Sequence, residues 1–395
     1  MLWLAVLLAG AYTIKRGFAP EVRHLDARSL YLGGACWSEG RSPYVEGNFD
    51  QAWQARFGTA RPSSMVFAYP PTIAALLVPI GLLPVKLGLA AIDVLNVLAL
   101  LASLVLLVPV LRRDPARPMS EPRFALALLL ALAVGAISGT LALGQSGFWV
   151  LAAILGLWAL PLSGASLPAA ILIFACSFKP SISLPFLAYS AVTRPRAVGL
   201  AALFGVPVVA ALALTSGVSL LGEWMLAIRS YAMQTDNGPL SLASGQHLVA
   251  LLLPHVPAPA LALAAAALGA AVGWSARVSR SDRPSLDDLL LLSASVVAFS
   301  SIHGYDLVIA VPLAAAIPFV RPGMRLWYLP LVALLMRPPL AERALLKLFP
   351  HLSQGGPLAA GVAGLILTAL LLRQRLREPG FQPMAGGGQT TAASA

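Results

Sequence analysis

Residues 65–84 of the chain read MVFAYPPTIAALLVPIGLLP, and this run decides how the rest of the chain is arranged. Its hydropathy is that of a membrane-spanning helix, but it contains Pro70, Pro71, Pro79 and Pro84. Because proline interrupts the hydrogen bonding of a helix, we expect a re-entrant or half-buried pair of short helices that does not cross the membrane. If the run did cross, the orientation of every later helix would be reversed.

The composition excludes a water-soluble globule. Of the 395 residues, 58% are hydrophobic and 11% are charged, and the mean hydropathy is +0.81, whereas soluble domains average about 25% charged residues. Long apolar runs separated by short polar breaks predict an all-α polytopic membrane protein. The net charge of +11 comes without a basic face interleaved with aromatic side chains. It therefore predicts arginine-rich cytoplasmic loops and no nucleic-acid partner.

The apolar runs predict about twelve transmembrane helices, with both termini in the cytoplasm. The first run, Met1–Ile14, is short for a span and has no clean cleavage site, so we expect a retained helix and not a signal peptide. The remaining predicted spans are Leu87–Leu111, Phe124–Leu143, Phe148–Pro161, Leu167–Phe178, Ser181–Val192, Val198–Val218, Ala258–Arg277, Leu286–Ile302, Leu307–Val320, Leu326–Met336 and Leu358–Leu372.

The distribution of arginine favours this orientation. The short outer turns at Gln145, Lys179 and His303 contain one cation, Lys179, whereas cytoplasmic loops are usually rich in lysine and arginine. If residues 65–84 crossed the membrane, the arginine clusters would lie outside. The predicted cytoplasmic arginines are Arg112, Arg113, Arg117 and Arg123, then Arg194 and Arg196, then Arg277, Arg280 and Arg283, then Arg321 and Arg325, and last Arg373, Arg375 and Arg377.

The pattern predicts one integral-membrane domain, residues 1–377, with two long extracytoplasmic loops at 15–86 and 219–257. Within the first loop, Tyr31–Trp37 and Gln51–Phe57 could each form a short amphipathic helix in the membrane interface, anchored by Trp37, Trp53 and Phe57. The remaining residues, 378–395, are rich in Gly, Ala, Thr and Ser and predict a disordered cytoplasmic tail.

The polar residues that interrupt the apolar runs fall on the extracytoplasmic side in this arrangement. Asp26 lies in the first loop, and Gln145, Lys179 and His303 each follow a predicted span. Ionisable groups at the ends of apolar spans are costly and often functional. Each has a structural alternative, because Asp26 could cap a helix, Lys179 could extend to the interface and His303 could be an interfacial histidine.

The order of several short motifs resembles that of glycosyltransferase family 87, which belongs to the GT-C class of membrane enzymes. The first motifs are Asp26, Tyr31, Gly40 and Pro43-Tyr44, followed by Phe67-x-Tyr69-Pro70-Pro71, Gly144-Gln145, Lys179-Pro180 and Ser300-x-x-His303-x-Tyr305. This resemblance covers residues 23 to 320. It implies a GT-C-like bundle in which a sugar, often mannose, is transferred from a polyprenyl phosphate on the extracytoplasmic face.

The same resemblance assigns the catalytic base to Asp26. Many GT-C enzymes carry paired acids in the first loop, whereas this chain has His24-Leu25-Asp26. We therefore predict no cofactor; the case for a divalent metal is weakened, and metal dependence stays open. A carboxylate can take the proton of an acceptor hydroxyl, and a single displacement inverts the anomeric centre with one such group.

The leaving lipid phosphate gains charge as the sugar is transferred, and fixed cations or hydrogen-bond donors stabilise that charge. Lys179 and His303 are the expected cations or donors, with Arg28 as a weaker candidate. Tyr69 is expected at the lip of the lipid groove, and Tyr44 could stack on a sugar ring. The residues expected to bind the donor are Lys179, His303, Gln145, Tyr69, Arg28 and Tyr305.

The partners expected are a polyprenyl-phosphate sugar, a lipid or glycan acceptor and membrane lipids. High Ala, Leu, Gly, Pro and Arg content indicates a bacterial inner membrane, with the active site facing the periplasm. Two other functions stay open, a transporter or flippase of a lipid-linked glycan and an assembly subunit without chemistry. Transporters place ionisable residues near the bilayer midplane on broken helices, whereas here they lie at the ends of spans.

Overall fold

The structure is a computed structural model that describes residues 1–18, 25–63, 65–112, 119–234, 241–253, 255–337 and 358–377. These residues form helices and connecting turns, without a strand among them. The predicted tail, together with His24, Arg113 and Arg117, lies outside the described residues. The N-terminal helices are α1 (Leu2–Gly17), α2 (Leu25–Ser38), α3 (Glu46–Phe57), η2 (Pro71–Ile73), α4 (Ala74–Gly81) and α5 (Val85–Leu111).

The rest of the chain continues as short and long helices in alternation. The central helices are α6 (Glu121–Leu132), α7 (Ala136–Leu143), α8 (Gly147–Ala159), α9 (Ser166–Cys176), α10 (Pro180–Thr193), α11 (Pro195–Ser216) and α12 (Leu220–Met233). The C-terminal helices are α13 (Gly245–Leu252), α14 (Ala258–Val278), α15 (Leu286–Phe299), η5 (Gly304–Ala310), α16 (Val311–Ala316), η6 (Ile317–Phe319), α17 (Pro322–Met336) and α19 (Leu358–Arg377).

Within the described residues, four helices are long and apolar enough to cross a membrane, namely α5, α11, α14 and α19. The pair α6 and α7 would add a fifth span, although it is bent by 51°. These helices indicate a membrane protein, but the expected count of about twelve spans is not confirmed. A straight span needs about 20 residues, and other apolar helices, such as α8, α9 and α17, are shorter.

The proline-rich run at residues 65–84 forms an extended segment followed by η2 and α4. Pro71 occupies the first turn of η2, where its missing N–H costs nothing. Together η2 and α4 are shorter than the four candidate spans, which agrees with the expectation of short helices in this run.

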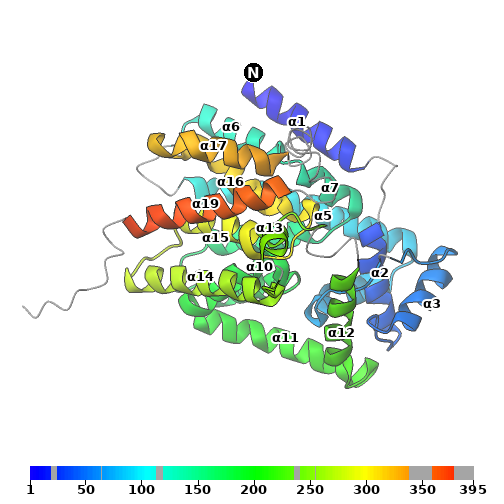
Figure 1. Cartoon of the computed structure of the whole chain (residues 1–395). Helices are drawn as coiled ribbons and strands as arrows, with labels where there is room; N and C mark the ends of the chain where they lie inside the picture. Colours follow the sequence, from blue (N-terminus) through cyan, green and yellow to red (C-terminus); the bar gives the residue numbers. More distant parts are fainter. Residues whose placement is uncertain are drawn as a thin grey trace, which may run out of the picture.

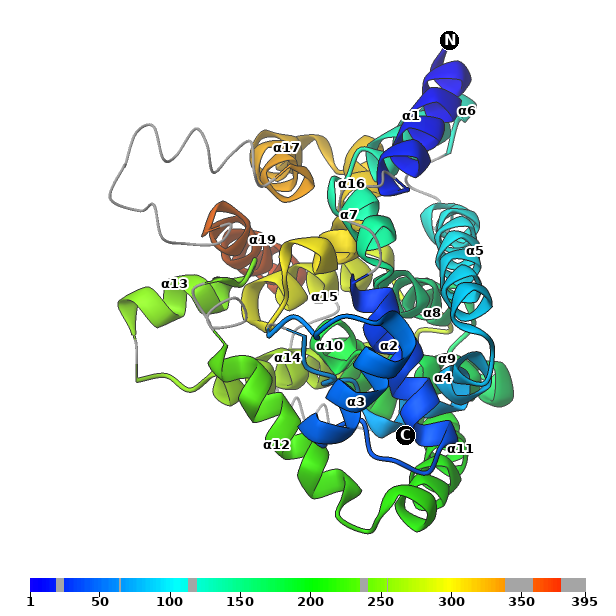
Figure 2. The same ribbon diagram turned by 90° about the vertical axis from the view of Figure 1, so that its right-hand side faces the viewer.

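Several long helices lie nearly parallel, and two helices lie across one of their ends (Figure 1). In this view α11, α14, α17 and α19 run side to side, whereas α2 and α12 cross them at the right. Figure 2 looks onto this end, where α2, α3 and α12 face the viewer. We call it the α2 end of the molecule.

Glycines seat α2 directly on α4. A Cβ atom added at Gly34 would lie 2.0 Å from the Leu77 carbonyl oxygen, and one added at Gly81 would lie 2.2 Å from the Ala35 nitrogen. Neither position can therefore accept a side chain while the two backbones keep this spacing. The Tyr31 hydroxyl also donates to the Leu83 carbonyl oxygen at 2.8 Å, which fixes α2 along its length.

An aromatic cluster packs α2 against α3 and the segment before η2. Trp37 packs edge-on against Phe67 with ring centroids 5.2 Å apart, and Phe49 joins Phe67 to Trp53. Trp37 and Trp53 are both buried. They pack inside the protein, so the expectation that these two side chains anchor the loop in the membrane interface is wrong.

Candidate active site

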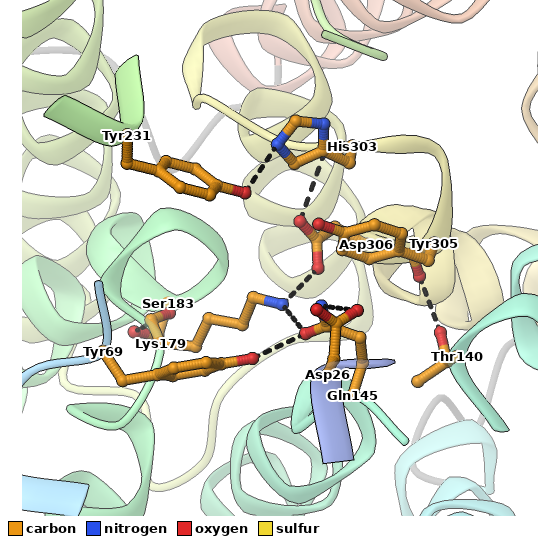
Figure 3. A network of polar contacts seen from close by, with 10 residues as sticks. All are labelled: Asp26, Tyr69, Thr140, Gln145, Lys179, Ser183, Tyr231, His303, Tyr305 and Asp306. Atoms are coloured by element: carbon orange, nitrogen blue, oxygen red, sulfur yellow. Dashed lines mark hydrogen bonds and ion pairs between the residues drawn. The ribbon is translucent and has the colours of Figure 1, made fainter. Parts of the chain in front are cut away.

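Polar side chains from six separate parts of the chain meet at the α2 end (Figure 3). Asp26 comes from the first turn of α2, Gln145 from the turn between α7 and α8, and Lys179 from the residue before α10. The segment before η2 adds Tyr69, the helix α12 adds Tyr231, and the start of η5 adds His303, Tyr305 and Asp306. A continuous set of hydrogen bonds and ion pairs joins Asp26 to His303.

The Asp26 carboxylate is the acidic end of this network. Its Oδ2 atom accepts a hydrogen bond of 2.6 Å from Gln145 Nε2. Burial raises the pKa of Asp26 to about 6, against opposing effects of the Gln145 hydrogen bond and of the Lys179 charge. A carboxylate with this pKa is ionised at neutral pH and is more basic than an exposed one.

The turn that carries Gln145 is held against α2 by a glycine. Gly144 has φ +71°, a conformation that residues with a Cβ rarely adopt. A Cβ atom at this position would also lie 2.4 Å from the Ala27 Cβ. The Gln145 N–H donates to the Thr140 carbonyl oxygen at 3.0 Å, which closes the end of α7. The sequence Gly144-Gln145 therefore places the amide next to Asp26.

Lys179 lies between an amide oxygen and a second carboxylate. Its Nζ atom is 2.8 Å from Gln145 Oε1 and 2.6 Å from Asp306 Oδ1. The side chains of Lys179 and Asp306 are 11% and 3% exposed, so solvent screens their attraction little. The ammonium also lies 5.2 Å from the centroid of the Tyr305 ring. These contacts fix the cation without an external anion.

His303 and Asp306 form a capping box at the start of η5. The Asp306 carboxylate accepts the His303 backbone N–H at 3.2 Å, and the His303 ring accepts the Asp306 backbone N–H. The ring nitrogen Nε2 lies 3.1 Å from the Tyr231 hydroxyl oxygen. Because the other ring nitrogen accepts, Nε2 carries the proton of the neutral ring and donates to Tyr231. Burial lowers the pKa of His303, which favours this neutral form; Asp306 opposes the shift and Lys179 adds to it.

Tyr305 and Tyr69 form the aromatic walls of the network. The Tyr305 ring stacks on His303 with centroids 5.3 Å apart and an interplanar angle of 30°. The Tyr69 hydroxyl donates to Gln145 Oε1 at 2.7 Å. Burial raises the pKa of both phenols, so both hydroxyls stay protonated at neutral pH.

The structure brings together six of the seven residues expected in the site. They are Asp26, Tyr69, Gln145, Lys179, His303 and Tyr305. The seventh residue, Arg28, lies with its guanidinium 5.0 Å from the centroid of the Phe57 ring in α3. Tyr44 does not offer a face for sugar stacking, because it is buried in the aromatic cluster and donates to the Tyr69 carbonyl oxygen at 2.7 Å.

Two members of the network were not expected from the sequence as site residues, Asp306 and Tyr231. The spacing His303-x-x-Asp306 is that of a capping box, but the Ser/Thr and Glu/Gln of the sequence signature are absent. The position of Asp306 in a polar stretch after an apolar run could have identified it. Nothing in the local sequence around Tyr231 indicates a contact with His303. Among the described residues, no three His, Cys, Asp or Glu side chains gather in a way that could hold a metal ion.

One comparison with known proteins gives a match. The sequence model described as "Glycosyltransferase family 87" matches residues 67–301, which is more than half of the chain. The matched range includes Tyr69, Gln145 and Lys179, whereas Asp26 precedes it and His303 follows it. No curated protein and no solved structure gives a significant match.

Proposed function

Since this chain belongs to glycosyltransferase family 87, and is therefore a glycosyltransferase, we propose that it acts as an inverting enzyme. Its donor is a polyprenyl-phosphate sugar, with mannose as the first candidate, and its acceptor is a lipid or glycan. Asp26 is the general base. The observation that carries this assignment is the half-buried Asp26 carboxylate, held 2.6 Å from Gln145 in one network with Lys179 and His303.

The reaction needs one base and one displacement. Asp26 takes the proton of the acceptor hydroxyl while the acceptor oxygen bonds to the anomeric carbon. The bond between that carbon and the phosphate oxygen breaks at the same time, and its electron pair leaves with the lipid phosphate. A base is most effective when its pKa lies near the working pH. The pKa of about 6 for Asp26 supports this role.

The donor phosphate is assigned to the Lys179 side of the network. A fixed cation in a partly dry site stabilises the charge that develops on a leaving phosphate. Tyr305 lies next to this cation and stacks on His303, and Gln145 connects the cation to Asp26. Tyr69 donates to the same Gln145 oxygen. A phosphate that binds Lys179 either shares the ammonium with the Asp306 carboxylate or takes the place of that carboxylate.

The α2 end is assigned to the extracytoplasmic side of a bacterial inner membrane. Arg194 and Arg321 directly precede α11 and α17, while Arg277 and Arg377 belong to the last turns of α14 and α19. All four of these helix ends lie away from α2, α3 and α12 (Figure 1). Because arginine marks cytoplasmic ends, this arrangement supports an outward-facing network.

The test is transfer of a labelled sugar by the purified protein. The protein is incubated with labelled polyprenyl-phosphate mannose, and in parallel with other polyprenyl-phosphate sugars, in the presence of a membrane lipid extract. We expect a labelled lipid or glycan product from the wild type and from Asp282→Asn, which replaces an exposed carboxylate. Asp26→Asn should insert into the membrane but form no product. Normal turnover by Asp26→Asn would remove the assignment of the base.

The same preparation separates an enzyme from a flippase. In sealed vesicles, movement of a lipid-linked glycan across the bilayer without a new covalent product would support a flippase. Product formation in detergent, where no transport is possible, would support the glycosyltransferase.

A further inference from the structure

The orientation of the Gln145 amide is determined by its neighbours. Its oxygen Oε1 lies 2.8 Å from Lys179 Nζ and 2.7 Å from the Tyr69 hydroxyl. An ammonium can only donate hydrogen bonds, so the amide atom facing it must be the oxygen. The amide nitrogen is then the atom 2.6 Å from Asp26 Oδ2. A flipped amide would place its NH₂ group against Lys179.

The backbone below this amide is equally constrained. Gln145 follows the left-handed Gly144, which touches Ala27 in the first turn of α2, and the side chain of Gln145 is buried. Ala27 is the neighbour of Asp26, so the amide and the carboxylate approach each other from two surfaces in direct contact. This geometry leaves Gln145 one position relative to Asp26.

The two oxygens of the Asp26 carboxylate have different surroundings. Gln145 occupies Oδ2, and no donor in the described part of the chain pairs with Oδ1. Lys179 and Tyr69 both donate to the far end of the same amide, which polarises its N–H groups and strengthens the bond to Asp26. The Gln145 hydrogen bond also lowers the pKa of Asp26 against the effect of burial.

We propose that Gln145 is a positioning residue, which holds Asp26 Oδ2 so that Oδ1 faces the acceptor hydroxyl. This inference rests on the proposed function. It differs from the sequence-based expectation that Gln145 binds the donor. A donor-binding residue would act on the donor KM, whereas a residue that orients the base acts on kcat and on the pH dependence of transfer.

The test compares Gln145→Met and Gln145→Glu with the wild type in the labelled-sugar assay across pH. Gln145→Met removes the amide donor at similar size. We expect kcat to fall about 10- to 100-fold, the rate equivalent of one hydrogen bond to a charged group. The donor KM should change less than about threefold. The acidic limb of the pH profile should move to higher pH, because the hydrogen bond that lowers the pKa of Asp26 is lost.

Gln145→Glu keeps the shape of the side chain and an oxygen for Lys179 and Tyr69, so it guards against a simple folding defect. A second carboxylate beside Asp26 disfavours ionisation of either one, so the acidic limb should again move to higher pH. Tyr69→Phe is the matched control, since it removes one donor from Gln145 Oε1 and leaves the other. Its shift should follow the same direction and be smaller.

Two results would overturn this inference while leaving the proposed function intact. In the first, Asp26→Asn is inactive but both Gln145 variants keep the wild-type kcat and acidic limb. In the second, the loss in both variants lies entirely in the donor KM, which would return Gln145 to the donor side. If instead Asp26→Asn turns over normally, the proposed function itself fails, and the inference fails with it.

Discussion

Lys179 and Asp306 form a buried ion pair, with 2.6 Å between Nζ and Oδ1. Lys179 precedes α10, and Asp306 lies in η5, so the pair ties two distant segments together at the α2 end. The cation expected to meet a lipid phosphate therefore already has a carboxylate partner. This partner compensates the buried charge, and the first prediction follows from it.

We predict strong coupling between Lys179 and Asp306 in stability. Removing one partner of a buried ion pair leaves an uncompensated charge and typically costs about 3–5 kcal/mol. Lys179→Met and Asp306→Asn should therefore each lower the melting temperature in detergent, and the double variant should lose less than the sum of both. The control is the pair Arg321 and Asp287, which are 3.9 Å apart and 53% and 24% exposed. Exposed pairs are worth about 0–1 kcal/mol, so this second cycle should be nearly additive.

We predict that sugar transfer falls as the pH drops through about 6. The base must be ionised to accept a proton, and burial raises the pKa of Asp26 to about 6. The kcat/KM profile should be flat above this pH and should decline below it. An acidic limb near pH 4, the ordinary range of an aspartate, would contradict the raised pKa of Asp26.

We predict that Asp26→Asn is more stable than the wild type at neutral pH. The folded state raises the pKa of Asp26, so the folded protein binds a proton more tightly than the unfolded chain does. The ionised carboxylate therefore costs stability, by roughly 3 kcal/mol for a shift of this size. This cost is present above pH 6 and disappears as the pH falls towards the ordinary value of the group. Melting temperatures at pH 7.5 and pH 5 should show a gain for Asp26→Asn that is larger at pH 7.5.

If Asp26→Asn raises the melting temperature equally at pH 7.5 and pH 5, the stability change does not come from the ionisation of Asp26, and the prediction is wrong. Asp282→Asn removes an exposed carboxylate and serves as the control, for which we expect no gain at either pH.

We predict that Gly144→Ala abolishes most transfer. The new Cβ would have to adopt φ +71° and would lie 2.4 Å from the Ala27 Cβ. A left-handed conformation alone costs about 1–3 kcal/mol, and the contact forces the Gln145 turn away from α2. Gly164→Ala is the control, because Gly164 has φ +81° but no atom within 4 Å of the added Cβ. It should lose stability but retain transfer, as measured with the labelled donor. Equal activity in both variants would show that the contact with Ala27 is unimportant.

Much of the helical arrangement could be predicted from the sequence. The predicted runs Leu87–Leu111 and Ala258–Arg277 correspond closely to α5 and α14, because long apolar runs between charged residues have clear ends. The number of spans could not be predicted in this way. Hydropathy reports how apolar a run is, whereas Pro185 inside α10 or the bend between α6 and α7 changes what the run can cross.

The site was predictable where its residues interrupt apolar runs. Asp26, Gln145, Lys179 and His303 are polar residues at the ends of such runs, and the structure brings all four together. The partner of each could not be read from the sequence, because pairs such as Tyr231 and His303 depend on how α12 crosses the other helices.

The two glycines at the contact between α2 and α4, Gly34 and Gly81, also have a consequence for mutagenesis. Since only hydrogen fits between the two backbones at these positions, a side chain at either one must push α2 away from α4, and Asp26 moves with α2. Random mutagenesis should then find inactivating replacements at Gly34 and Gly81, although neither glycine belongs to the polar network around Asp26.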